Sequence, residues 1–269
     1  MKAIVLSGGG AKGAYQAGVW QALRKLRIKY DIVTGTSIGA LNGMFMVQKD
    51  FNKCLYLWKN INFDQIYNDF KANNKKEIYK SYFDSIIKGG ISTLKIEQLI
   101  ANNYNPKKLY NSKIKYGVVT YNVSNLSVYY ATNENTKAEQ LKNYIMASAT
   151  CFPVFKPKKI DNDTYIDGGF YDNLPLNLAI DLGATQIIAV DLDAVGIKKR
   201  VKNREVKITS ISPTNKLESF LMFDKNVTKK MIKFGYNDTL KAFNKLEGHT
   251  YTFKKGFLNN NYKKHHLKF

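Results

Sequence analysis

The sequence predicts a three-layer α/β/α fold, in which helices cover both faces of a mostly parallel central sheet. Two observations carry this prediction. A short apolar strand at 2–7 precedes a helical pattern at 14–26, and a strand at 32–36 precedes a helix at 37–48. Later in the chain, a helix at 174–184 leads directly into a strongly apolar strand at 185–193. Strands that alternate with helices through short connections must run parallel, with the helices packed on the sheet.

The first strand and helix have the clearest patterns. The strand is apolar and closes on three glycines. The helix that follows has apolar residues at three-residue spacing, which is the spacing of one helix face: Ala14, Ala17, Trp20, Leu23 and Leu26.

The middle of the chain predicts a helical insertion followed by a hairpin. Residues 51–103 show helical patterns throughout, which indicates a cap-like region packed on the sheet. The later elements are expected as strands at 115–123, 126–132 and 164–169, and as helices at 137–149 and 217–243.

Length and composition indicate one enzyme-sized globular domain over residues 1–269. The chain has no internal repeat, and 44% of its residues are hydrophobic, as is usual for a buried core. No apolar run reaches the length of a membrane span, and the first apolar run is too short for a secretory signal. Cys54 and Cys151 have no metal or redox spacing, which favours a reducing, cytoplasmic setting. A peripheral position on membranes is expected from the basic region described next.

The formal net charge of +21 is the one extreme value of the composition. Residues 198–269 form a basic C-terminal region, with 18 Lys and Arg against 5 Asp and Glu. Such a surface attracts anionic phospholipid headgroups or nucleic acid, and its plainer interpretation is a solvated basic face. Because the chain lacks the basic and aromatic pattern of a nucleic-acid motif, we expect an anionic membrane and no nucleic acid.

Ser37 is the first candidate for chemistry. It is the centre of Gly35-Thr36-Ser37-Ile38-Gly39, the Gly-x-Ser-x-Gly pattern that places a serine nucleophile on a tight turn. This pentapeptide lies between a predicted strand and a predicted helix, as a nucleophile elbow requires. The alternative is an ordinary N-cap serine.

The glycine-rich stretch 8–13 allows three interpretations. Its Gly-x-Gly-x-x-Gly spacing matches a dinucleotide loop, although Asp31 comes too early in its strand to bind a ribose. The phosphate-binding loop of a nucleoside triphosphatase would have Lys followed by Ser or Thr at the positions of Ala14 and Tyr15, so this sequence does not match that loop. The third interpretation is an oxyanion hole built from glycine amides.

Asp167 is the candidate base. Asp167-Gly168 alone is a common turn signal, but a buried carboxylate beside a serine can accept the hydroxyl proton directly. A Ser–His–Asp triad of Ser37, Asp167 and His249 is the competing arrangement, because its chain order matches that of hydrolases with an elbow serine.

These motifs together resemble the patatin-like phospholipase family, over about residues 2–193. Its motifs stand in order as the glycine-rich loop 8–13, the elbow 35–39, the segment 147–157 and the triplet Asp167-Gly168-Gly169. One departure is Cys151, at a position where alanine is commoner in the family.

The resemblance implies a patatin-like fold and a lipid acyl hydrolase of the phospholipase A or lysophospholipase type, acting on phospholipid or lysophospholipid without metal or cofactor. It implies a dyad in which Ser37 attacks the ester and Asp167 moves the proton, with an oxyanion hole at Gly8, Gly9 and Gly10. By the same resemblance four residues support the site: Lys12, Gly13, Gly35 and Gly39. Two other classes remain as alternatives, a nucleotide-binding module and a basic nucleic-acid-binding protein. The sequence indicates no oligomeric state.

Overall fold

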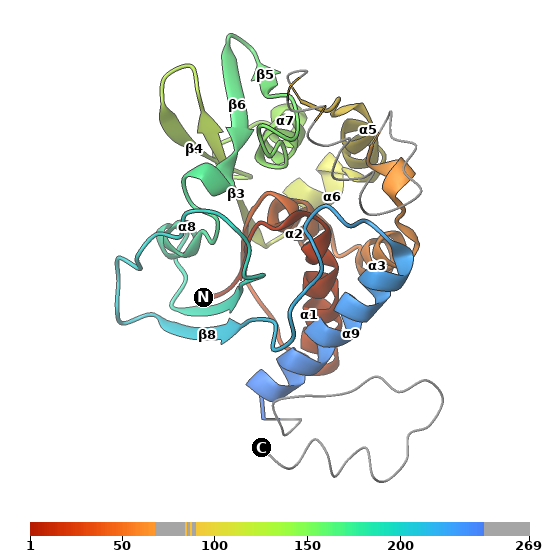
Figure 1. The fold of residues 1–269 in the computed structure, drawn as a ribbon. Helices are drawn as coiled ribbons and strands as arrows, with labels where there is room; N and C mark the ends of the chain where they lie inside the picture. The colour runs from red at the N-terminus through yellow and green to blue at the C-terminus, as the bar shows by residue number, and fades with distance from the viewer. Residues whose placement is uncertain (68–83, 85–86, 88–89, 245–269) are drawn as a thin grey trace.

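The protein has a mixed sheet at its centre, seen in a computed structural model that describes residues 1–67, 84, 87 and 90–244 (Figure 1). Its strands are β1 (Lys2–Leu6), β2 (Ile32–Thr36), β3 (Lys115–Asn122), β4 (Ser127–Thr132), β5 (Lys158–Ile160), β6 (Asp163–Asp167), β7 (Gln186–Val190) and β8 (Lys207–Ile211). The order is β5-β6-β3-β2-β1-β7-β8, and β4 also pairs with β3. The pairs that join β3, β2, β1, β7 and β8 are parallel, whereas β4, β5 and β6 join antiparallel. The predicted α/β class with a mostly parallel sheet is confirmed.

Helices and 3-10 turns surround this sheet. The helices are α1 (Gly13–Lys25), α2 (Ile38–Gln48), α3 (Phe51–Asn60), α5 (Leu94–Asn103), α6 (Pro106–Tyr110), α7 (Ala138–Ser148), α8 (Leu176–Asp181) and α9 (Lys225–Ala242). The 3-10 turns are η1 (Gly10–Lys12), η2 (Phe63–Gln65) and η3 (Gly168–Phe170). None of the helices in the described ranges has the length and apolarity needed to cross a membrane.

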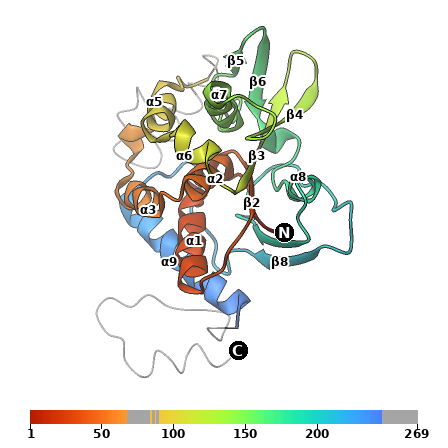
Figure 2. The ribbon, with the colours of Figure 1, turned by 180° about the vertical axis from the view of Figure 1, so that it is seen from behind.

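The two faces of the sheet bury different layers because side chains alternate along a strand. Ala3 and Val5 of β1 pack in the smaller apolar cluster with α8. Ile4 and Leu6 point the other way, into the larger cluster that holds residues of α1, α2, α3, α7 and α9. Figure 2 shows this separation, with α8 on one side of the strands and α1, α2 and α3 on the other. The three layers predicted from the sequence are therefore unequal in size.

Helix α9 runs alongside α1 at very short range (Figure 1). Glycines make the crossing possible, since a Cβ at Gly18 would lie 1.9 Å from the Ile232 carbonyl oxygen, and a Cβ at Gly235 would lie 2.0 Å from the Tyr15 carbonyl oxygen. The Tyr15 hydroxyl also donates a 3.0 Å hydrogen bond to the buried Asp238 carboxylate of α9. The described part of the basic C-terminal region is therefore fastened to the helix that follows the glycine-rich loop.

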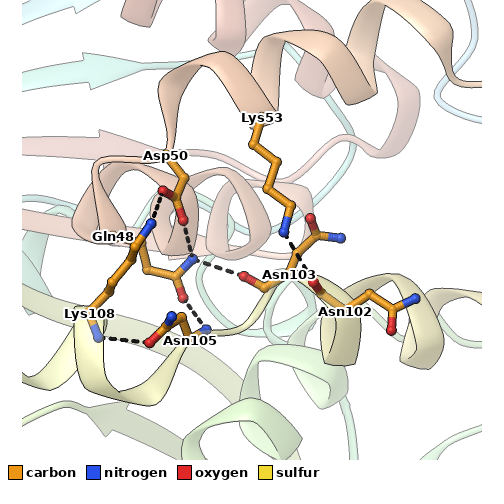
Figure 3. A network of polar contacts seen from close by, with 7 residues as sticks. All are labelled: Gln48, Asp50, Lys53, Asn102, Asn103, Asn105 and Lys108. Carbon is orange, nitrogen blue, oxygen red and sulfur yellow. Dashed lines mark hydrogen bonds and ion pairs between the residues drawn. The ribbon is translucent and has the colours of Figure 1, made fainter.

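A polar network joins the α2–α3 corner to the α5–α6 connection (Figure 3). The Gln48 side chain donates to the Asn103 carbonyl at 2.9 Å and accepts from the Asn105 amide at 2.7 Å. Asp50 forms an ion pair with Lys108. The Lys53 ammonium of α3 also donates to the Asn102 carbonyl of α5 at 3.1 Å. Both of these helices contribute residues to the cavity described below.

One expectation about a single element changes, and another falls partly outside the described residues. The helix expected at 217–243 begins only at Lys225, because the Asp224 side chain caps it by accepting from the Asn226 and Val227 amides. Residues 217–223 instead bury Leu221, Met222 and Phe223 without helical structure. The cap-like region 51–103 contains α3, η2 and α5, and most of its residues from 68 to 89 lie outside the described part. The short strands β5 and β8 had no clear sequence pattern.

Candidate active site

Ser37 occupies a strained turn between β2 and α2. Its φ of 57° and ψ of −126° are unfavourable for a residue with a side chain, so the surrounding packing must impose them. The two flanking glycines allow that packing. A Cβ at Gly35 would lie 2.4 Å from the Gly39 carbonyl oxygen, and a Cβ at Gly39 would lie 2.3 Å from the Leu6 carbonyl oxygen. The Gly-x-Ser-x-Gly spacing thus serves a close approach of backbone to backbone.

Sheet register brings Asp167 to Ser37. Asp167 is the last residue of β6, which pairs with the same side of β3 as β2 does, because β4 occupies the other side along Gly117–Asn122. Thr36 lies opposite Val119 of β3. Asp167 lies opposite the next β3 residue, Thr120. The ends of β2 and β6 therefore meet along one side of β3, which brings Ser37 and Asp167 together, and both line the same cavity.

The Asp167 carboxyl is shielded from water, with only 4% of the residue exposed. This burial raises the pKa of Asp167 from 3.8 to about 6, even though the Ser37 hydroxyl and the Gly169 amide both stabilise the charged form. The Gly169 amide donates to one carboxylate oxygen at 2.7 Å. Asp167 is thus a carboxylate that faces the serine hydroxyl and is charged at neutral pH, with a basicity above that of an ordinary aspartate.

Two amides of the glycine-rich loop have no acceptor among the described residues. The Gly8 amide is already used, since it donates to the Asn173 carbonyl at 3.1 Å. The Ala11 amide is used as well, because it donates to the Phe220 carbonyl at 2.7 Å. The amides of Gly9 and Gly10 donate to no acceptor among the described residues, and both glycines line the cavity beside Ser37. The amides available for an anion are therefore those of Gly9 and Gly10, whereas the sequence also proposed Gly8.

Lys12 and Gly13 are the last two residues of this loop. The Lys12 ammonium donates to the Asp193 carbonyl at 3.0 Å and reaches the Leu192 carbonyl at 3.5 Å, so it ties the loop to the segment after β7. Burial lowers the pKa of Lys12, while the Asp193 and Asp191 carboxylates oppose that effect. At Gly13 a Cβ would meet the Ile38 side chain at 2.4 Å, so the absence of a side chain lets α1 approach the elbow.

Three residues that sequence reasoning assigned to no site hold these loops together. Ser148 accepts a 2.8 Å hydrogen bond from the Ser37 amide through its hydroxyl. The Asp172 carbonyl accepts from the Thr36 hydroxyl at 2.8 Å. The next residue, Asn173, fastens Gly8 as described above. Ser148 lies within the segment 147–157, which is one of the motifs of the family resemblance, and no local signal marks Asp172 or Asn173.

Replacing Ser148 with alanine should lower the free energy of unfolding by about 1–3 kcal/mol, because it leaves the buried Ser37 amide without an acceptor. Urea unfolding followed by circular dichroism measures the change. Ser210→Ala, on the exposed part of β8, is the matched control and should stay within about 0.5 kcal/mol. Equal midpoints for the two variants would show that this hydrogen bond does not support the elbow.

A cavity of about 720 Å³ opens beside Ser37 and Asp167. Its walls are mainly apolar and come from α2, α3, α5 and the segments around 151–155 and 220–223. Six of the apolar wall residues are Leu41, Leu57, Trp58, Ile96, Leu99 and Phe155. The site therefore combines a serine and a carboxylate with a large, mainly apolar cavity.

Of the residues that the competing interpretations require, Asp31 lies away from this site. The Asp31 carboxylate accepts from the Lys2 amide at 2.8 Å, at the start of β2 and thus at the opposite edge of the sheet from Gly8. It cannot act as the ribose ligand of a dinucleotide site. His249 lies outside the described residues, as do His265 and His266.

Comparison with known proteins supports the family resemblance that the motifs indicate. The sequence profile described as patatin-like phospholipase matches residues 4–180. Patatin-like phospholipase domain-containing protein 7 of Rattus norvegicus is 28% identical over 195 residues, which are 71% of this chain and 13% of that protein. Lysophospholipase NTE1 of Scheffersomyces stipitis is 28% identical over 193 residues, 70% of this chain and 11% of that protein. The chain thus spans only a small part of these longer relatives.

A solved structure shares the fold. The crystal structure of VipD from Legionella pneumophila aligns with a TM-score of 0.55 and 16% sequence identity, covering 90% of this chain and 66% of that one. The family resemblance predicted from the motifs is confirmed, because the matched profile covers more than half of the chain. This chain belongs to the patatin-like phospholipase family.

Proposed function

We propose that the protein hydrolyses acyl esters of phospholipids or lysophospholipids with Ser37 as nucleophile and Asp167 as general base. The observation that carries this proposal is the position of Ser37, on a strained elbow, facing a buried carboxylate at the end of a large apolar cavity. The names of the longer relatives, a phospholipase and a lysophospholipase, support the choice of lipid substrate.

The proposed reaction has two halves. Asp167 accepts the Ser37 proton as the serine oxygen attacks the ester carbonyl carbon, and the oxyanion that forms accepts hydrogen bonds from the Gly9 and Gly10 amides. The C–O bond to the alcohol then breaks, and Asp167 returns the proton to the departing alcohol oxygen. In the second half, water attacks the acyl-serine while Asp167 takes its proton. Collapse of that intermediate releases the fatty acid and returns the proton to Ser37.

In this proposal the apolar cavity holds the acyl chain. Leu99→Trp, which fills part of the cavity wall on α5, should lower the ratio of activity on a sixteen-carbon ester to that on a four-carbon ester by roughly tenfold. The matched control is Leu94→Trp on the same helix, where the side chain is half exposed and does not line the cavity. A p-nitrophenyl ester series measures both ratios. An unchanged ratio in Leu99→Trp would place the acyl chain elsewhere.

Activity should decline about tenfold per pH unit below about pH 6, because Asp167 must be charged to accept the serine proton and its pKa is raised to about 6. The measurement is kcat/KM against pH for a soluble short-chain ester. Burial also raises the pKa of Asp172 to about 6, so the profile is repeated with Asp172→Asn, in which the acid limb should persist. A profile that stays flat to pH 4.5 in the wild type would contradict Asp167 as the base.

The test of the proposed function is the release of fatty acid from phosphatidylcholine and lysophosphatidylcholine, together with labelling by a fluorophosphonate. Mass spectrometry should find the phosphonyl adduct on the peptide that contains Ser37. A folded protein that releases no fatty acid and accepts no label would overturn the proposal. Retention of NAD or FAD in equilibrium dialysis would then favour the nucleotide-binding alternative.

A further inference from the structure

Exposed apolar side chains gather where the cavity opens to solvent. Eleven large hydrophobic residues are exposed among the described residues, and five of them also line the cavity. A side chain that both lines a cavity and is exposed stands at its mouth. We call this group the apolar rim, and it consists of Phe152, Phe170, Val195, Ile197 and Phe220. Val195 is fully exposed, and the other four are 38–52% exposed.

The backbone holds the most exposed part of the rim in place. The Ile197 amide donates to the Gly169 carbonyl at 3.0 Å, and the Ile197 carbonyl accepts from the Asn173 amide at 2.5 Å. These bonds attach the loop after β7 to the segment that follows Asp167. The exposure of Val195 and Ile197 is therefore imposed by well-bonded backbone, and clusters of exposed apolar residues mark interaction sites in soluble proteins.

Positive charge follows the rim without interruption along the chain. The basic flank comprises Lys198, Lys199, Arg200, Lys202 and Arg204, and no acidic residue occurs between Asp193 and Glu205. Lys198 pairs with Asp191 at 2.6 Å, and the Lys199 ammonium lies 3.8 Å from the centre of the Tyr171 ring.

The far end of the basic flank is both anchored and exposed. The Lys202 amide donates to the Asn177 side chain at 2.8 Å, and Asn177 in turn donates to the Arg200 carbonyl. The side chains of Lys202 and Arg204 are exposed and form no ion pair with a described residue. One loop with fixed backbone thus carries apolar residues at the cavity mouth and, further along the chain, exposed cations.

We propose that the apolar rim and the basic flank form a docking surface for an anionic lipid bilayer. This inference rests on the proposed function, and it names the surface through which that site would meet its substrate. Charge complementarity selects the occupant, because the cations attract anionic headgroups while the rim enters the acyl boundary below them. Docked in this way, the cavity mouth faces the membrane, and an acyl chain passes from the bilayer to Ser37 without crossing water.

Vesicle binding tests the surface independently of catalysis. Flotation of the full chain with phosphatidylcholine vesicles, with and without phosphatidylglycerol, measures the partition coefficient. Val195→Ser/Ile197→Ser should lower binding to the anionic vesicles by roughly tenfold or more. Lys202→Gln/Arg204→Gln should lower it by a similar factor at low salt and reduce its salt dependence. The control Leu126→Asn/Ile208→Ser removes two exposed apolar side chains that do not line the cavity and should bind as wild type does.

A second readout separates this inference from the proposed function. Lys202→Gln/Arg204→Gln should keep wild-type activity on a soluble short-chain ester and lose activity on anionic vesicles. Wild-type vesicle binding by both surface variants would overturn the docking surface, and activity on the soluble ester would then still support the proposed function. Loss of binding in all variants, including the control, would also overturn it, because binding would not depend on this face.

Discussion

Ser37→Ala should lower kcat for ester hydrolysis by roughly 10⁴-fold or more, because no other group can form the acyl intermediate that the proposed reaction requires. Asp167→Asn should have an effect of similar size, since an amide cannot accept the serine proton. Ester hydrolysis with a sensitive chromogenic substrate measures both. Because the two residues act as one unit, the double variant should be little worse than either single variant.

The stability of Asp167→Asn shows whether its loss of activity comes from misfolding. Asp167→Asn should raise the free energy of unfolding at pH 8 by about 1–3 kcal/mol, because it removes a buried carboxylate. The sign follows from the pKa of Asp167, which is 3.8 for the ordinary group and about 6 in the folded protein. The folded state holds the proton more tightly, so burial of the charge costs stability above about pH 6 and the cost disappears below about pH 4. An inactive Asp167→Asn with unchanged or higher stability would thus be a catalytic loss.

His249→Ala distinguishes the dyad from a triad. If Ser37 and Asp167 suffice, this variant keeps wild-type kcat. A folded His249→Ala with kcat reduced about as far as in Ser37→Ala would show that a histidine accepts the serine proton, and the proposal for Asp167 as the base would be wrong.

Gly235→Ala should destabilise the protein by more than about 3 kcal/mol, the largest stability effect we expect from one methyl group. The added Cβ would lie 2.0 Å from the Tyr15 carbonyl oxygen, so α9 has to move away from α1. That movement would strain the buried contact between Tyr15 and Asp238 and disturb the helix that follows the glycine-rich loop. Thermal and urea unfolding measure the effect, and activity should decline along with stability.

The control for this prediction is Lys229→Ala, on an exposed position of α9. It should change stability by no more than about 0.5 kcal/mol, because it adds no contact and alanine favours a helix. If Gly235→Ala unfolds at the same urea concentration as Lys229→Ala, the close crossing of α1 and α9 does not contribute to stability.

Local sequence patterns predicted those parts of the site that are formed by consecutive residues. A strand, a Gly-x-Ser-x-Gly turn and a helix occupy consecutive residues, so the elbow at Ser37 could be expected from 32–48 alone. The same holds for the glycine-rich loop after β1. Helix periodicity failed at 217–224, because the buried apolar residues there pack as an irregular segment until Asp224 caps α9.

The sequence by itself determined the fold class, the family and the placement of Ser37 and the glycines on tight turns, because these depend on the pattern within short stretches. Only the tertiary structure decided that β2 and β6 end next to each other along β3, which brings Asp167 to Ser37, since strand register is set by pairing between distant segments. It also decided that the Gly8 amide is used by Asn173 and that Ser148 supports the elbow. Hydrogen-bond partners, burial and the exposure of the apolar rim depend on which distant segments become neighbours, and no local pattern contains that information.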